Sequence, residues 1–160
     1  MTSFRDAHKV ANDLAEVVVT TQPVASTGWT TTVQTFDKVP TVGGKSFRVL
    51  EIGFTVTVAG TNTADADAFD FGITGSTSAF IDAGGIPANP AAGTTISTSQ
   101  GGASTLAFRL AGVGNVDADG YPFLNTGDVL QVLPTGNVTN GPTVVFFARL
   151  APEINRDIDV

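Results

Sequence analysis

The chain has 160 residues, enough for one domain that buries about 70% of its unfolded surface. Its formal net charge is -7 and no Lys or Arg occurs between Arg48 and Arg109, so the sequence argues against nucleic acid as a partner. Cysteine is absent, which excludes disulfides and Cys-ligated zinc. The apolar runs are far shorter than the roughly 20 residues of a membrane span, so no membrane partner is expected.

Charged residues are scarce. They make up 14% of the chain, against about 25% in a typical soluble domain, while the hydrophobic share is ordinary at 42%. Thr, Ser, Gly and Ala take the place of the missing charge. Such a surface is weakly hydrated, and burying it against a partner costs little desolvation. The composition is therefore a first indication of assembly.

The N-terminal segment, residues 1–13, differs from the rest in being charged and free of Gly and Pro. It is compatible with a short helix or an extended arm, and leaves no room for the apolar core of a signal peptide. Two interpretations stay open: a frayed terminus, or an arm that docks on a neighbouring molecule. The second makes interface candidates of Phe4, Arg5, His8 and Lys9.

Strand signals follow in short segments that are β-branched or alternate between apolar and polar residues. They fall at residues 14–21, 29–36, 47–58, 69–73, 78–82, 94–99, 105–110, 128–133 and 143–150. Residues 83–104 are rich in Gly, Ala, Thr and Pro, and so long a connection indicates a functional loop or a missed strand, with 94–99 as the candidate strand. Residues 112–125 are expected to be loop.

The segment 47–58 gives the clearest strand. Alternation predicts one buried face made of Leu50, Ile52, Phe54, Val56 and Val58. Phe47 and Val49 are out of phase with that set. This change of phase predicts a bulge near Val49 and Leu50.

The most apolar part of the chain lies in residues 121–150. Two runs, 128–133 and 143–150, flank a Gly/Asn/Pro-rich connection and predict a β-hairpin with a long loop. One face of the second run comprises Val144, Phe146, Ala148 and Leu150. Val145 and Phe147 fall on the other face, which needs separate cover from the 83–104 loop, the N-terminal arm or another subunit. We favour the subunit, and Val145 and Phe147 are then interface candidates.

The tally of about eight strands with almost no helix predicts an all-β protein. We expect an antiparallel β-sandwich, an eight-stranded jelly roll with a short N-terminal arm, and the nearest rival is a seven-stranded Greek-key sandwich. In this scheme residues 14–151 form the sandwich domain, residues 1–13 the arm and residues 152–160 a C-terminal tail.

No pair of activated catalytic groups is evident, so we expect no enzyme. His8 is the only histidine and lies in the charged N-terminal segment, where no buried carboxylate orients it as a catalytic triad requires. Gly112 and Gly114 give a G-x-G pattern without the third glycine or the βαβ unit of a dinucleotide site, so no cofactor is expected. Trp29 and Tyr121 suit core or rim packing, with stacking on a sugar as the alternative.

Acidic residues give one metal candidate. Asn115, Asp117, Asp119 and Gly120 match the first six positions of a calcium loop, D-x-[DN]-x-[DN]-G. Thr126 stands at the twelfth position in place of the bidentate Glu, so we expect a surface turn and no metal, with Ca²⁺ as the alternative. Three further aspartates, Asp65, Asp67 and Asp70, are expected to form a solvated strand entry.

The whole resembles the decoration (cement) and head-stabilising proteins of tailed bacteriophages. The features that carry this are the charged arm, the Cys-free Thr/Gly/Ala-rich β-domain and the ending FLNTGDVLQVLP…TVVFFARLAPE. The ending also resembles the trimeric C1q/TNF-type jelly rolls, in which a G-D-x-L strand and an apolar terminal strand pack near the three-fold axis.

The phage resemblance implies a structural virion protein. It would bind the outside of a capsid, bridge neighbouring capsomers and have the major capsid protein and its own copies, as a homotrimer, for partners, with no cofactor. Two other classes stay open. One is a receptor- or glycan-binding domain of a head fibre or spike, which would use exposed aromatics and the 83–104 loop. The other is a small jelly-roll coat protein.

Overall fold

The computed structural model describes residues 16–25, 29, 32–36, 46–99, 106, 108, 121–125, 128–136 and 138–152. This part of the chain consists of strands and connecting loops and contains no helix. It therefore contains no helix that is long and apolar enough to cross a membrane. Its strands are β1 (Val17–Thr20), β2 (Gln34–Thr35), β3 (Phe47–Val58), β4 (Asp65–Ile73), β5 (Ser76–Ile86), β6 (Thr95–Ser97), β7 (Phe123–Leu124), β8 (Leu130–Pro134) and β9 (Thr143–Pro152).

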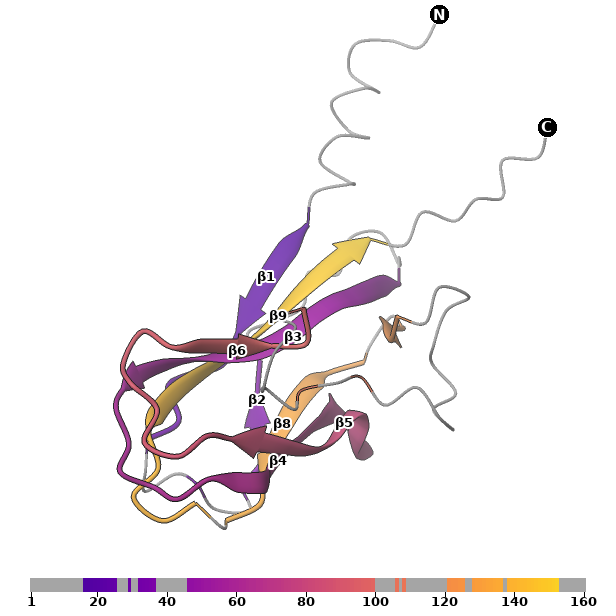
Figure 1. Cartoon of the computed structure of the whole chain (residues 1–160). Coiled ribbons are helices and arrows are strands. Elements are labelled where there is room, and N and C mark those ends of the chain that lie inside the picture. Colours follow the sequence, from indigo (N-terminus) through magenta and orange to yellow (C-terminus); the bar gives the residue numbers. More distant parts are fainter. Residues whose placement is uncertain are drawn as a thin grey trace, which may run out of the picture.

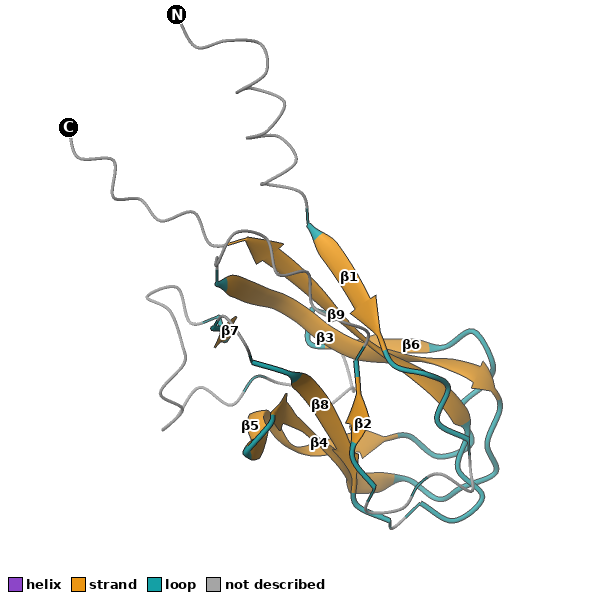
Figure 2. Cartoon of the chain, turned by 180° about the vertical axis from the view of Figure 1, so that it is seen from behind, coloured by secondary structure: helices purple, strands orange, loops and turns teal. Residues whose placement is uncertain are grey.

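The strands form two antiparallel sheets. The first sheet has the order β1-β9-β3-β6, and the second has the order β2-β8-β4-β5. The short β7 pairs with the beginning of β3, and β6 pairs with its middle. Figures 1 and 2 show the two layers from opposite sides. The prediction of an all-β antiparallel sandwich is confirmed.

Phenylalanines from both sheets join the two layers. The ring centroid of Phe69, on β4, lies 4.9 Å from that of Phe146, on β9, and both rings lie within 6 Å of the ring of Phe54, on β3. All three side chains are fully buried, and the edge-to-face geometry of the pairs is favourable. Trp29 packs edge-on against Phe146, and its indole N–H donates to the carbonyl oxygen of Pro142 at 2.9 Å. Trp29 is therefore a core residue, as the packing interpretation predicts.

Strand β3 agrees with the predicted segment 47–58 and contains the predicted bulge. Its register against β9 shifts between Val49 and Glu51, so Leu50 is the additional residue. Leu50 is half-buried, and Val58, beyond a second register shift, is 57% exposed. The predicted inward placement of Leu50 and Val58 is wrong, because each shift takes a residue out of the alternation.

Strands β8 and β9 do not form the predicted hairpin. β8 pairs with β2 and β4 in the second sheet, whereas β9 pairs with β1 and β3 in the first. The connection between them, residues 135–142, therefore leads from one sheet to the other. The Gly, Asn and Pro residues of this connection predict that the chain reverses direction, but they do not determine to which sheet the next strand belongs. A connection of this length can span the roughly 10 Å between packed sheets.

The segment 83–104 is partly strand. β5 extends to Ile86, well beyond the predicted end at residue 82, and β6 occupies Thr95–Ser97. The interpretation that this stretch contains a missed strand at 94–99 is confirmed.

Two further strands differ from the prediction. β4 begins at Asp65 in place of residue 69, and Phe123–Leu124, expected as loop, form β7. The predicted strand 105–110 lies outside the described residues except for Leu106, which is buried, and Phe108, which packs against the core.

Candidate interaction face

The first sheet presents its outward side chains as one continuous surface, which we call the outer face. Along β9, the residues Val144, Phe146, Ala148 and Leu150 are fully buried, while Thr143, Val145, Phe147 and Arg149 alternate with them and are partly exposed. The register adds the outward residues of the neighbouring strands. The outer face comprises Val18, Thr20, Glu51, Thr55, Thr95, Val145, Phe147 and Arg149, and Ser97 lies on the same side of the sheet but is fully buried.

The apolar part of the outer face lies over β1 and β9. Val18, on the edge strand β1, is 60% exposed and stands opposite Arg149 in the register. Phe147 stands between Thr20 and Gly53, and its ring lies against the backbone of Gly53. The absence of a side chain at Gly53 is what permits the ring to come this close to the strand.

Several hydroxyl groups of the first sheet are hydrogen-bonded within the chain. Oγ1 of Thr55 and Oγ1 of Thr95 lie 3.0 Å apart across β3 and β6. On the other side of β3, Oγ1 of Thr57 donates to the carbonyl oxygen of Thr143, the first residue of β9, at 3.1 Å. Each of these three hydroxyls therefore has a hydrogen-bond partner within the chain.

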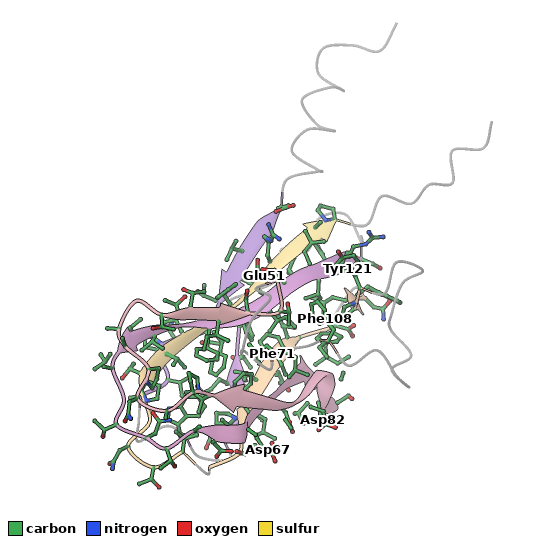
Figure 3. The ribbon with its side chains drawn as sticks, viewed as in Figure 1. Glu51, Asp67, Phe71, Asp82, Phe108 and Tyr121 are labelled. Carbon is green, nitrogen blue, oxygen red and sulfur yellow. The ribbon has the colours of Figure 1, made fainter. Side chains whose placement is uncertain are left out.

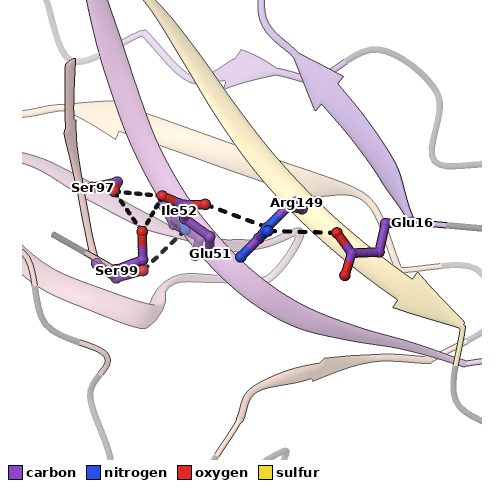
Figure 4. A network of polar contacts seen from close by, with 7 residues as sticks. Glu16, Glu51, Ile52, Ser97, Ser99 and Arg149 are labelled. Atoms are coloured by element: carbon purple, nitrogen blue, oxygen red, sulfur yellow. Dashed lines mark hydrogen bonds and ion pairs between the residues drawn. The ribbon is translucent and has the colours of Figure 1, made fainter. Parts of the chain in front are cut away.

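A charged network occupies one end of the outer face (Figure 4). The hydroxyls of Ser97 and Ser99 both donate to Oε1 of Glu51. On the other side, Nε of Arg149 lies 3.3 Å from Oε2 of Glu51, and its Nη1 lies 3.5 Å from Oε2 of Glu16. The Nε–H of Arg149 is not aligned for a hydrogen bond, so its contact with Glu51 is an ion pair without one.

The backbone holds the serines in place. The backbone N–H of Ile52 donates to Oγ1 of Thr98, and the backbone N–H of Thr98 donates to the carbonyl oxygen of Ile52 at 2.8 Å. Residues 97–99 are thereby fixed beside β3, with Ser97 and Ser99 on the side of Glu51.

The pKa of Glu51 lies below its ordinary value of 4.5. Burial alone would raise the pKa, but the hydrogen bonds from Ser97 and Ser99 and the positive charge of Arg149 together outweigh it. Glu51 is thus held as a carboxylate, with a cation on one side and two hydroxyl donors on the other. This arrangement neutralises charge on the sheet surface and leaves no carboxyl proton for acid catalysis at neutral pH.

The outward surface of the second sheet has the opposite character. Its four strands contain Asp65, Asp67, Asp70 and Asp82, and no Lys, Arg or His. Asp67 and Asp82 are exposed, and Figure 3 shows both at the margin of the second sheet, far from Glu51. Oδ1 of Asp65 accepts a hydrogen bond from the backbone N–H of Asp67, in keeping with the predicted solvated strand entry.

Of the predicted site residues, the structure describes only Val145 and Phe147, and it brings them together on the outer face. Phe4, Arg5, His8 and Lys9 lie outside the described residues, as do the calcium candidates Asn115, Asp117 and Asp119. Among the residues that are described, no three or more His, Asp or Glu side chains gather closely enough to hold a metal ion.

The network around Glu51 was not predicted from the sequence. Glu51 and Ser97 are 46 positions apart, and serines in a Ser/Thr/Gly-rich stretch give no signal of their own. Arg149 does give one, because it is the only charged residue in an otherwise apolar strand. A lone cation in such a strand indicates an acidic partner on a neighbouring strand.

Tyr121 is the exposed aromatic of the pair considered for sugar stacking. Its side chain is 37% exposed, and the guanidinium of Arg48 lies 5.6 Å from its ring centroid in a cation–π contact.

No family model, no curated protein and no solved structure matches this chain.

Proposed function

We propose that this chain is a structural virion protein that binds the outside of a phage capsid and stabilises it by bridging capsomers. The observation that carries the proposal is the outer face of the first sheet, whose hydroxyls and charges are already paired within the chain. Burying such a surface costs little desolvation, which suits a protein whose role is to lie against other proteins.

The fold we propose is a jelly roll. If the short β7 is set aside, four strand pairs nest one inside the other along the chain: β1 with β9, β2 with β8, β3 with β6, and β4 with β5. A single antiparallel ribbon wound around a barrel-like core gives this nesting, with each sheet receiving alternate pairs. Viral capsid domains are among the common users of jelly rolls, which favours the virion assignment without identifying the protein's place in the particle.

The proposed partners are the major capsid protein and further copies of this chain, as a homotrimer. Three copies on one capsid site combine weak contacts through multivalency. The N-terminal arm, residues 1–13 with Phe4, Arg5, His8 and Lys9, is the proposed contact to the capsid. No catalytic role and no cofactor form part of this proposal.

Co-sedimentation with purified capsids tests the function directly. The full chain and a variant lacking residues 1–13 are mixed with expanded, DNA-free phage heads, and bound protein is measured after centrifugation. We expect saturable binding of the full chain and at least a tenfold loss of affinity without the arm. If the full chain binds none of the capsids, the proposed function is contradicted. If the shortened chain binds as well as the full chain, only the role of the arm is contradicted.

Glycan binding by a head-fibre or spike domain is the alternative function. The exposed Tyr121 ring beside Arg48 favours it, because sugars stack on exposed aromatic faces. A glycan array probed with the full chain and with Tyr121→Ala distinguishes the two functions. Hits that disappear in Tyr121→Ala support the alternative, and an array without hits contradicts it.

A further inference from the structure

The two sheets differ in the balance of their charges. The strands of the first sheet carry Arg48, Glu51 and Arg149, and Glu16 lies directly before β1, so the positive and negative charges there are equal in number. The strands of the second sheet carry four aspartates and no cation. The chain as a whole has a net charge of -7. The outer face is therefore a neutral surface on a strongly acidic protein.

The outer face also combines apolar side chains with polar groups that have partners within the chain. Its apolar side chains are Val145 and Phe147, which follow one another on the outward side of β9, and Val18, which stands on β1 opposite Arg149. Around them, the hydroxyls of Thr55 and Thr95 are bonded to each other, and Glu51 has three partners of its own. A partner that covers this surface displaces water from apolar groups that lie beside hydroxyls and a carboxylate with partners within the chain.

We propose that the outer face is the surface on which a second copy of this chain docks. The inference deepens the proposed structural role and rests on it for the premise of self-association. Two copies of a protein with net charge -7 repel one another over most orientations. Contact through the outer face puts a neutral surface against the second copy, whereas contact through the second sheet would bring its four aspartates up to an acidic neighbour. Given self-association, the distribution of charge thus favours the outer face over the second sheet.

The size of the outer face sets the strength of the contact. Strands lie about 4.8 Å apart and rise about 3.3 Å per residue. β1 has four residues and β6 three, beside the ten of β9 and the twelve of β3, so the four strands outline at most about 460 Å² per copy. Stable interfaces bury about 600 to 1,000 Å² per partner. The contact lies below that range, and we expect weak association that depends on protein concentration.

The experiment measures the mass of the full-length protein and two single variants, Val18→Asp and Val145→Asp, by sedimentation over about 1 to 100 µM. We expect the wild type to form oligomers, with masses that are multiples of the 16.4 kDa chain. Each variant places like charges across the interface, and we expect its dissociation constant to rise about 100-fold or more. Val18 is 60% exposed, so Val18→Asp keeps the fold and carries the test should Val145→Asp fail to fold.

The matched control is Val33→Asp. Val33 is also an exposed valine, at 38%, but it precedes β2 of the second sheet. Oligomers that persist in Val33→Asp and dissociate in Val18→Asp support the inference. A monomeric wild type at every concentration overturns it, and so do oligomers that survive Val18→Asp or dissociate equally in the control.

The same variants separate this inference from the proposed function. An oligomer that dissociates in Val18→Asp but never binds capsids contradicts the virion role and leaves the interface standing. A monomeric wild type that binds capsids contradicts the interface and leaves the virion role standing.

Discussion

The ring of Phe147 fills the space that a side chain at Gly53 would require. A Cβ built on Gly53 would lie 2.8 Å from Cζ of Phe147 and 2.4 Å from the carbonyl oxygen of Ile96. The first contact is to the end of a side chain, whereas the second is to the backbone of the neighbouring strand β6, which cannot move without breaking its pairing with β3.

We therefore expect Gly53→Ala to destabilise the fold by about 1 to 3 kcal/mol, the usual cost of overpacking. Chemical denaturation of the variant and the wild type measures the difference. The same Cβ would lie 2.7 Å from Cβ of Ser97. In the double variant Gly53→Ala with Phe147→Ala, part of the lost stability should be recovered, because one of these three close contacts is gone. A Gly53→Ala variant as stable as the wild type would show that the strands separate more easily than their register implies.

The second prediction concerns pH. Because the pKa of Glu51 is lower in the folded chain than its ordinary value of 4.5, its stabilising effect is fully present above about pH 4.5. As the pH falls below that value, the unfolded chain takes up the proton first, and stability is lost until the folded-state carboxyl is protonated as well. Thermal unfolding of the wild type and Glu51→Gln between pH 3 and pH 7 tests this.

Glu51→Gln should unfold at a lower temperature at neutral pH, and the difference from the wild type should shrink below pH 4.5. Glu16→Gln is the matched control, since it removes a carboxylate from the exposed end of the same network and leaves the serine bonds of Glu51 intact. A difference that stays constant across this pH range would refute the role assigned to ionised Glu51.

The third prediction uses Trp29, the only tryptophan of the chain. Its side chain is 3% exposed and its indole N–H is bonded to Pro142, so its fluorescence emission should be blue-shifted in the folded protein and move to longer wavelength on unfolding. Trp29→Phe keeps most of the ring but leaves the Pro142 carbonyl without this donor. We expect a loss of about 1 to 3 kcal/mol by chemical denaturation followed by circular dichroism. Emission typical of solvent-exposed indole in the native protein would contradict the burial.

Local patterns predicted what local physics determines. The alternation along residues 47–58 predicted β3 at its full length, and the change of phase at Val49 predicted the bulge, because side-chain period and register are properties of a single strand. The same kind of reasoning separated Val144 and Phe146 from Val145 and Phe147 on the two faces of β9.

The pairing of strands that are distant in the chain could not be predicted from the sequence. The turn signals after β8 indicated a reversal but not a change of sheet, so the predicted hairpin was wrong. The network around Glu51 was not predicted for a related reason: Ser97 and Arg149 contact Glu51 from β6 and β9, the strands on either side of β3. Only the order of strands in the sheet makes these residues neighbours, and that order depends on the packing of the whole chain.

The pairing of β1 with β9 has a consequence for how the chain folds. The backbone N–H of Phe146 donates to Oγ1 of Thr21, a residue 125 positions earlier, and the register of the first sheet places Val17 opposite Leu150. On a ribosome, the first sheet therefore cannot close until β9 has emerged. Domains with such distant contacts fold in about milliseconds to seconds. Stopped-flow refolding followed by Trp29 should fall in that range, and microsecond refolding would mean that β1 and β9 meet only after the rate-limiting step.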